Sequence, residues 1–336
     1  MTGGPVAGGS GAGRPGAEDG RPFAVVLLDV NGTLVPSTPG PPPDRRALER
    51  LRRLVARLTA TGVAVGLCSD SPLEQLWGFG ERIGLGTPPG FPVVAENGNV
   101  VAVDGTVRTT TPFPALPGLR AEVAAAAAAR GLTRVDDVVA PEFGGRPPTG
   151  RDWAFGANRQ ASAGVFGAPD FIHDVRRRLT GWSAANRLGL SVELAPGHAY
   201  AVIHPYPRTA SGKRVALAAL AARAPRRRFL LVGNSPADWV PGVANVGCAF
   251  VADPSVPPQA RDAAWYVSPR PELAGVVDIL EHLLRRQPPT QGSARSRGGP
   301  HVPSPGGGGG LRDDRAAGAP PVSDGPARPL RRPGAL

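Results

Sequence analysis

The chain has 336 residues, enough for one large domain or two smaller ones, and a formal net charge of +11 that arginine supplies almost alone. No aromatic-rich basic segment or nucleic-acid-binding motif accompanies this charge, and no apolar run reaches the ~18 residues that cross a membrane. Since the two cysteines, Cys68 and Cys248, lack metal-ligand spacing, we expect a reduced, cytoplasmic protein that enters no membrane and does not have nucleic acid as its main partner.

The two ends of the chain have compositions that do not favour a packed fold. Residues 1–20 are mostly Gly, Ala and Pro, and residues 288–336 are rich in Gly, Pro and Arg. Neither segment has enough apolar residues to offset the entropy of ordering the chain. We therefore predict disordered tails around a folded part at about 21–287. Weak contact of the C-terminal tail with nucleic acid or an anionic surface is an alternative use of its arginines.

Apolar runs alternate with helical patterns over the first hundred residues. Strands buried on both faces are predicted at 23–30, 63–68 and 91–98, because these segments are short, apolar and rich in β-branched residues. Helices predicted at 43–62 and from Ser71 onward separate them. This order is typical of a parallel, doubly wound α/β sheet.

The alternation is interrupted in the middle of the chain and then resumes. Residues 100–205 have α+β character and are predicted to form a cap inserted into a core of 21–99 and 206–287. Within the insertion we expect a hairpin at 100–109, helices at 122–131 and 169–182, loops over most of 134–170, and paired strands across 190–205. The resumed pattern predicts a helix at 211–224, strands at 228–234 and 245–251, and a closing helix at 271–286.

Polar residues follow the predicted strands at the edge where their carboxyl ends meet. Ligands of open α/β sheets bind outside this edge. Loops that follow separate strands can converge there, so we expect these polar side chains to share one cleft. They are Asp29 and Asn31 after the first strand, Ser69 and Asp70 after the second, Glu96 and Asn97 after the third, and Asn234 to Asp238 after a later one.

Five short motifs carry a resemblance to a known family. In chain order they are LLDVNGTLV, VAVGLCSDSP, VVAENGN, SGKRVALAAL and LLVGNSPADW. Together they resemble the motifs of haloacid-dehalogenase-like (HAD) phosphatases, and the ENG turn and the place of the insertion resemble the Cof-type, sugar-phosphatase branch. The resemblance spans about 23–286 and implies a Rossmann-like core with a large α/β cap.

The resemblance also implies a part in phosphoryl transfer for several residues. Asp29 would be the nucleophile that forms an aspartyl-phosphate, and Lys213 would balance charge and bind phosphate together with Ser69 and Asp70. Small phosphorylated metabolites, sugar or glycerate phosphates first among them, would be the substrates. The cofactor would be Mg²⁺, and its ligands would be Asp29, Asn31 through its backbone carbonyl, Asn234 and Asp238.

Lys213 is notable without reference to any family. It is the only lysine of a chain in which lysine and arginine together number 38. If the composition favours arginine, a position that kept lysine needs a compact ammonium group rather than a planar guanidinium. A lysine that neutralises both a crowded aspartate and a phosphate oxygen occupies such a position.

Two positions depart from the HAD pattern. Asn31 replaces the aspartate that protonates the leaving group, and Asn234 replaces a metal-binding aspartate. A carboxamide can ligate Mg²⁺ through its oxygen, but it has no acid proton to give. Three hypotheses follow: substrates whose leaving group needs no proton, such as acyl phosphates; a slow sugar phosphatase with another acid, for example Asp70; or a protein that has lost turnover and binds a phosphorylated ligand.

The cap should choose the substrate, because it covers the leaving-group side of the site. The segment ANRQASAGVF resembles the RxxSEP segment of mannosyl-3-phosphoglycerate phosphatases, with Arg159 and Ser162 aligned and Ala163 in place of the glutamate. An arginine suits a second carboxylate or phosphate on the substrate; a solvated loop arginine is the alternative. Asn97 is a further candidate for substrate contact. The oligomeric state is left open.

Overall fold

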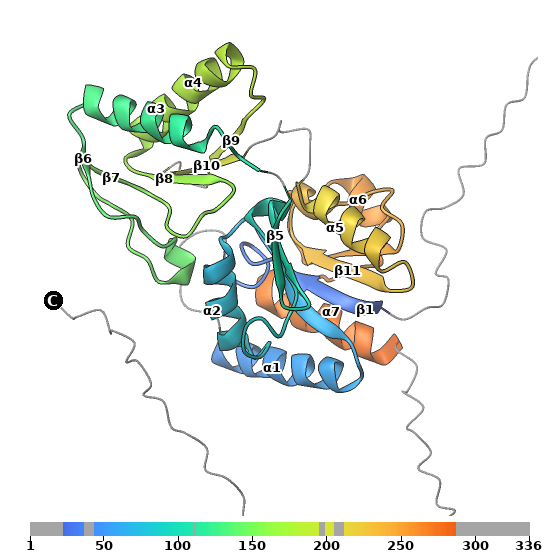
Figure 1. Cartoon of the computed structure of the whole chain (residues 1–336). Helices are drawn as coiled ribbons and strands as arrows, with labels where there is room; N and C mark the ends of the chain where they lie inside the picture. Colours follow the sequence, from blue (N-terminus) through green and yellow to red (C-terminus); the bar gives the residue numbers. More distant parts are fainter. Residues whose placement is uncertain (1–22, 37–43, 111, 195–198, 205–211, 287–336) are drawn as a thin grey trace, which may run out of the picture. The chain divides into compact units, whose positions relative to one another are not determined.

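The structure is a computed structural model that describes residues 23–36, 44–110, 112–194, 199–204 and 212–286. The tails predicted at 1–20 and 288–336 lie outside the described residues. Figure 1 shows a core and a second α+β unit, which the chain enters after β5. None of the helices in the described ranges is long and apolar enough to cross a membrane.

The core contains an eight-stranded sheet of the predicted α/β type. Its strand order is β13-β12-β11-β1-β2-β3-β4-β5, and the six strands from β13 to β3 are parallel. The strands are β1 (Phe23–Leu28), β2 (Ala64–Cys68), β3 (Val93–Ala95), β4 (Val100–Val103), β5 (Thr106–Thr109), β11 (Arg228–Gly233), β12 (Val246–Phe250) and β13 (Tyr266–Val267).

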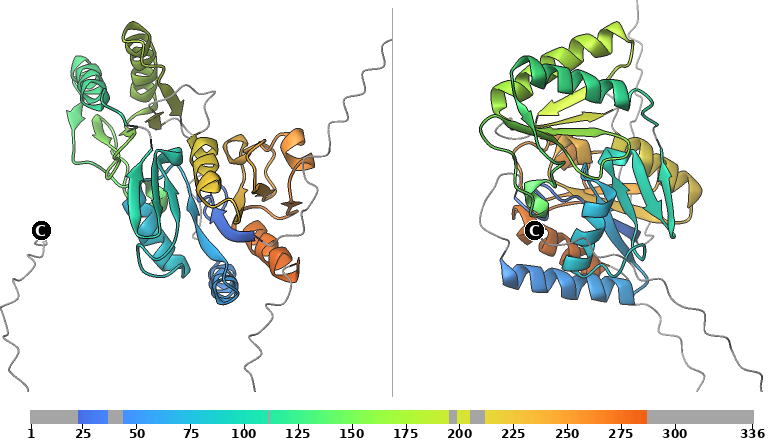
Figure 2. Two further views of the ribbon diagram at one scale, coloured as in Figure 1. Left: turned by 45° about the vertical axis from the view of Figure 1, so that its right-hand side comes forward. Right: turned by 60° about the vertical axis from the view of Figure 1, so that its left-hand side comes forward.

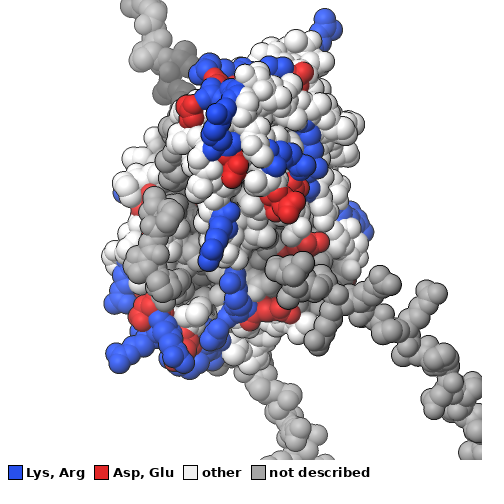
Figure 3. Space-filling view, turned by 90° about the vertical axis from the view of Figure 1, so that its left-hand side faces the viewer, with Lys and Arg blue, Asp and Glu red and all other residues white. Residues whose placement is uncertain are grey.

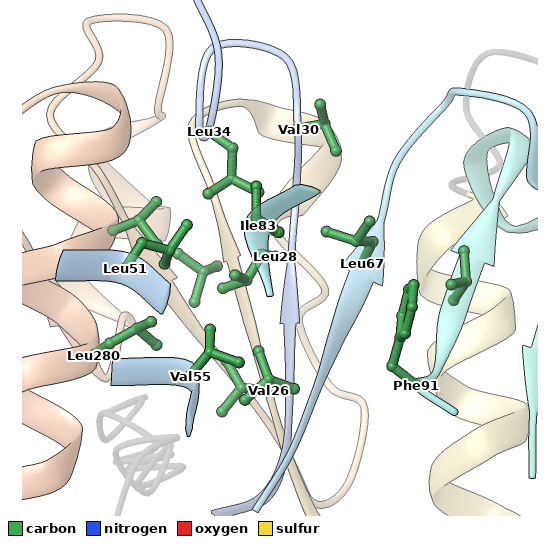
Figure 4. Packing of buried hydrophobic residues seen from close by; sticks show 14 of the residues in the cluster. Val26, Leu28, Val30, Leu34, Leu51, Val55, Leu67, Ile83, Phe91 and Leu280 are labelled. Atoms are coloured by element: carbon green, nitrogen blue, oxygen red, sulfur yellow. The ribbon is translucent and has the colours of Figure 1, made fainter. Parts of the chain in front are cut away.

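Alternate residues of the central strand β1 point to opposite faces of the sheet. Val26 and Leu28 pack with the helices α1 (Arg45–Ala60), α2 (Leu73–Ile83) and α7 (Glu272–Arg286). Figure 4 shows these two side chains among Leu51 and Val55 of α1 and Leu280 of α7. Val25 and Leu27 pack on the other face, where α5 (Gly212–Arg223) and α6 (Pro258–Asp262) lie. The sheet is therefore doubly wound, as predicted.

A second sheet carries the cap. Its order is β6-β7-β8-β10-β9, from the strands β6 (Thr133–Arg134), β7 (Asp152–Phe155), β8 (Ala163–Phe166), β10 (Tyr200–His204) and β9 (Ser191–Leu194). The helices α3 (Leu116–Ala129) and α4 (Pro169–Ala185) lie side by side on one face of this sheet (Figure 2). They enclose a separate apolar cluster that includes Trp153 and Phe171.

The cap differs from the sequence prediction in two respects. The hairpin at 100–109 forms as expected, but β4 pairs with β3 through Val93 and Ala102, so the hairpin extends the core sheet. The boundary expected at residue 100 was therefore wrong; the one expected at 206 lies in 205–211, outside the described residues. In addition, β7 and β8 occupy part of the segment predicted as loops, because strands of four residues are too short to show a period.

Candidate active site

The nucleophile candidate lies immediately beyond the first strand. The Asp29 amide donates a hydrogen bond to Val232 O at 2.8 Å, which continues the β1–β11 ladder and fixes the start of the loop. Gly32, with a φ of +75°, lets the chain turn back so that its amide reaches Val35 O at 2.7 Å. This turn sets Asp29 and Thr33 side by side at the carboxyl edge of the sheet.

Lys213 is the centre of the charged cluster. It lies in the first turn of α5, is 4 % exposed, and its Nζ is 2.8 Å from Asp29 Oδ1 and 2.6 Å from Asp238 Oδ1. Burial alone would lower its pKa, but the two carboxylates outweigh burial and raise the pKa well above its ordinary value. Lys213 is therefore a permanently charged ammonium that bridges residues following two different strands.

Asp29 is buried and responds to its surroundings in the opposite way. Burial raises the pKa of its carboxyl to about 6, since the attraction of Lys213 only partly offsets the loss of solvent, and Asp238 adds repulsion. The Thr33 hydroxyl lies 3.1 Å from Asp29 Oδ2 and 3.1 Å from Asn234 Oδ1. Both carboxylate oxygens of Asp29 are thus held in fixed positions. Thr33 was not among the predicted site residues, although it directly follows the predicted turn glycine.

Asp238 holds the loop after β11 in place. Its Oδ2 accepts hydrogen bonds from Asn234 N and Ser235 N, both at 3.1 Å, and from Ser235 Oγ at 2.8 Å. Gly233 makes room, since a Cβ there would lie 2.1 Å from Asp238 Cγ. With Oδ1 on Lys213, both oxygens of Asp238 are occupied. This arrangement positions Lys213 and the loop, and the metal-ligand role of Asp238 stays a prediction.

Asn234 has a partner that sequence reasoning missed. Its Nδ2 donates to Asp253 Oδ2 at 2.9 Å, which turns its Oδ1 toward Thr33 and Asp29. Slight burial would raise the pKa of Asp253, but hydrogen bonds from Asn234 and Ser255 outweigh it and lower the pKa. Asp253 keeps its negative charge beside the amide. The sequence could have indicated Asp253 as a site candidate, because it follows the apolar strand β12 at the same edge of the sheet.

The two residues after β2 take different positions. Ser69 is buried, accepts a hydrogen bond from Ser71 N at 3.3 Å, and its carbonyl accepts one from Asn97 N at 3.0 Å. Asp70 contacts the cap: its Oδ2 is 3.4 Å from Arg159 Nη2, and its Oδ1 is 3.3 Å from His204 Nε2. Burial would raise the pKa of Asp70, but the charge of Arg159, with a smaller effect of His204, outweighs burial and lowers the pKa. Asp70 is thus an ion-pair partner of the cap rather than a member of the Lys213 cluster.

The oxygen donors near Asp29 decide how a Mg²⁺ ion could be held. No group of three or more His, Cys, Asp or Glu among the described residues is arranged to hold a metal. Asp29 Oδ2 and Asn234 Oδ1 nevertheless face the same hydroxyl, and both are oxygen ligands of the kind that Mg²⁺ accepts. Mg²⁺ can bind through one or two carboxylates and keep several waters. The donor set therefore fits a hydrated Mg²⁺ with few protein ligands.

Comparisons with known proteins agree with this arrangement at the level of the fold. No model of a protein family and no curated protein sequence matches the chain. A solved structure of a haloacid dehalogenase-like hydrolase from Bacteroides thetaiotaomicron is similar with a TM-score of 0.56 and 14 % identity, over 78 % of this chain and 99 % of that one. A protein from Thermoplasma acidophilum has a TM-score of 0.51 and 19 % identity, over 79 % and 99 %. The chain has the HAD-like hydrolase fold, a core with a cap, which confirms that expectation.

Proposed function

We propose, with the HAD-like hydrolase fold as the premise, that this chain is a Mg²⁺-dependent phosphohydrolase that acts on small phosphorylated metabolites through an aspartyl-phosphate on Asp29. One observation carries the proposal: the only lysine of the chain is buried between Asp29 and Asp238. Burying three charged groups costs free energy of desolvation, so such a cluster is expected mainly where function requires it. A nucleophile that must approach a phosphate dianion requires a fixed cation beside it.

The residues of the chain account for the steps of the reaction. One oxygen of the Asp29 carboxylate forms a bond to phosphorus while the bond from phosphorus to the leaving oxygen breaks, and the leaving group takes the electron pair. Lys213 and Thr33 fix the plane of the carboxylate and so reduce the cost of orienting it. Water then attacks phosphorus while the bond from phosphorus to the Asp29 oxygen breaks, which restores the Asp29 carboxylate and releases inorganic phosphate carrying both protons of the water. A Mg²⁺ ion, held by Asp29 and Asn234, would offset negative charge on the phosphate oxygens.

The leaving group determines which substrates turn over quickly. Asn31 stands two residues after the nucleophile and has no acid proton to give. Acyl phosphates and aryl phosphates release anions that are stable without a proton, whereas sugar and glycerate phosphates release alkoxides that need one. We therefore expect sugar and glycerate phosphates to be hydrolysed more slowly, by about 10²–10⁴-fold if no other acid replaces the missing aspartate.

A substrate panel with Mg²⁺ tests the proposal. The purified protein should hydrolyse nitrophenyl phosphate and acetyl phosphate, and acid quenching should trap an acid-stable, base-labile phosphoryl group on Asp29. The Asp29→Asn variant, which keeps the size of the side chain, should lose both signals. A wild-type protein that shows neither signal but binds a phosphorylated metabolite saturably would instead support a phosphometabolite-binding protein, the candidate that Asn31 and Asn234 favour.

A further inference from the structure

The cap residue Arg159 is fully engaged by groups of the protein itself. Its side chain is 3 % exposed, and its Nη1 donates to Asp70 O at 3.1 Å and to Ser162 Oγ at 2.9 Å. Its Nη2 donates to Tyr200 Oη at 2.7 Å and lies 3.4 Å from Asp70 Oδ2. Few donors of the guanidinium remain for a substrate anion. This differs from the substrate-binding role that the sequence resemblance implied for Arg159.

A core glutamate faces the same turn of the cap. Glu96 has no exposed surface, and its Oε1 accepts from Gln160 N at 2.7 Å. Its Oε2 accepts from Ala161 N at 2.9 Å and from Ser162 Oγ at 2.6 Å. Ser162 therefore accepts a hydrogen bond from Arg159 and donates one to Glu96. The turn 159–162 is bound to the core at both of its ends.

The same contacts reach the segment that carries Ser69. Glu96 begins the 3₁₀ turn η1 (Glu96–Gly98), whose backbone amides donate to Ser71 O and Ser69 O, both at 3.0 Å. Arg159 reaches this loop from the cap side through Asp70 O. The loop 69–71 is thus held between a core turn and a cap arginine. The backbone carbonyls of this loop accept hydrogen bonds from both the core and the cap. The geometry of the loop therefore depends on the position of the cap.

The remaining end of η1 lies against the helix that carries Lys213. A Cβ at Gly98 would lie 2.2 Å from Gly212 O and 2.9 Å from Lys213 N. A continuous set of close contacts therefore runs from Arg159 through Ser162, Glu96 and Gly98 to the start of α5. Displacement of the cap turn would move both the loop that carries Ser69 and Lys213, because packed interiors transmit small shifts.

We propose that Arg159 is a positioning residue: it seats the cap turn 159–162 and the loop 69–71 together, so that Ser69 and Lys213 are in place for phosphate only when the cap is docked. This inference rests on the proposed function for its kinetic consequences. In this arrangement Arg159 does not touch the substrate. It acts through the backbone of Asp70 and through the Ser162–Glu96 pair.

The surroundings of Arg159 offer a second way to disturb it without removing its charge. Gly164 in β8 lies against it, and a Cβ there would lie 2.8 Å from Tyr200 Oη and 3.1 Å from Arg159 Nε. A Gly164→Ala change would therefore push on the guanidinium and its tyrosine partner. An Arg159→Lys change would keep a positive charge, but one ammonium group cannot reach Asp70, Ser162 and Tyr200 together as the planar fork does.

Hydrogen exchange provides a readout that does not depend on turnover. In Arg159→Ala, the amides of 69–71 and 96–98 should exchange faster than in the wild type, and Gly164→Ala should show a smaller change at the same amides. Arg176→Ala, at an exposed site on α4, removes the same charge from the cap and should leave both segments unchanged. Unaltered exchange of both segments in Arg159→Ala would overturn the proposal, whether or not the wild type is a phosphatase.

Kinetics then separate positioning from substrate contact. With nitrophenyl phosphate, which carries no second anion, Arg159→Ala should lower kcat by about 10–100-fold, as displacements of about 1 Å do. The loss with phosphoglycerate should be similar, and Arg159→Lys should restore part of it. If the effect were instead a rise in KM confined to phosphoglycerate, with kcat for nitrophenyl phosphate unchanged, Arg159 would be a substrate ligand and the proposal would be wrong.

Discussion

At the scale of single residues, the charge state of Asp29 sets the lower pH limit of the proposed reaction. Only the carboxylate form can attack phosphorus, and burial raises the pKa of this group to about 6. We therefore expect kcat/KM for nitrophenyl phosphate to rise with pH through a midpoint near about 6 rather than near the ordinary value of aspartate. The charge of a bound Mg²⁺ would lower this pKa, so the test uses limiting Mg²⁺, where a midpoint below about 4.5 would mean that Asp29 is not buried as described or is not the nucleophile.

The same carboxyl should affect folding stability in a definite direction. A pKa raised in the folded state means that the folded protein binds the proton more tightly than the unfolded chain does. The resulting stabilisation is fully present below about pH 4 and is lost as pH rises through about 6. Asp29→Asn lacks this titration. We therefore expect the stability of the wild type relative to Asp29→Asn to decrease as pH rises across this range. Urea denaturation of both proteins measures this difference in free energy of unfolding.

Position 31 permits a test of the missing acid. Asn31→Asp would place a carboxyl two residues after the nucleophile, where it could protonate an alkoxide leaving group. Turnover of sugar or glycerate phosphates should rise by up to about 100-fold, while turnover of acetyl phosphate should change little. Initial rates on both substrate classes provide the measurement. Equal or reduced rates on both would exclude the explanation based on a missing acid.

Much of the residue set could be predicted, because parallel strands bring their carboxyl ends to one edge. Asp29, Lys213, Asn234 and Asp238 lie close together, and Asp238 also holds Lys213 and the loop. The positions of Thr33 and Asp253 after predicted elements were visible in the sequence, but their hydrogen-bond partners were not. They depend on side-chain rotamers that join residues far apart in the chain, about which periodicity and spacing carry no information.

At the scale of elements, the turn η1 packs closely against the first turn of the helix that carries Lys213. Gly98 has a φ of +95°, and a Cβ there would collide with Gly212 O. Gly98→Ala should therefore strain the turn and push the first residues of α5, destabilising the fold by about 2 kcal/mol or more and displacing Lys213. Gly105→Ala is the control, because it also has a positive φ of +73° but has no atom within 4 Å of the added Cβ.

The expected outcome separates collision from backbone strain. Gly105→Ala should lower the melting temperature slightly and keep activity, whereas Gly98→Ala should lower both the melting temperature and kcat. If both variants lost stability equally and kept kcat, the contact of η1 with α5 would have no effect on Lys213. The sequence had indicated an Asn-Gly turn at this place, but its packing on the helix that carries Lys213 became visible only in the structure.

At the scale of the whole molecule, one face of the described chain carries charges of both signs. On the face shown in Figure 3, arginine and acidic side chains lie next to one another over both the cap and the core. Ion pairs such as Arg130 with Asp170 and Asp174, or Arg178 with Glu122, join opposite charges in the described chain. Interspersed charges of this kind are typical of a solvated surface. That nucleic acid is not the main partner stays a prediction.

The elements that sequence reasoning predicted best are the long ones of the core. The helices α1 and α7 and the strands β1 and β11 lie where apolar periodicity placed them. The cap was less predictable because β6, β7 and β8 are only two to four residues long and gain their stability from pairing with distant segments. For the same reason the hairpin β4–β5 was assigned to the cap, although it pairs with β3.

Separate apolar clusters in core and cap lead to a prediction about unfolding. The cluster around Phe171 draws its members from residues 113–203 alone, whereas the cap residues Ala161 and Phe143 pack on the core cluster. Phe171→Ala removes a side chain with no exposed surface and should cost about 3–5 kcal/mol. Because this loss lies wholly within the cap cluster, the cap should open before the core does.

Hydrogen exchange followed by mass spectrometry would show whether the two clusters are independent. In Phe171→Ala, the amides of α3, α4 and β8 should lose protection, while those of β1, β2 and β11 keep theirs. Leu28→Ala, a change to a fully buried side chain of the core cluster, should reduce protection throughout, because the cap turn 159–162 is anchored on core groups. Equal loss of protection in core and cap for Phe171→Ala would mean that the two clusters unfold as one cooperative unit.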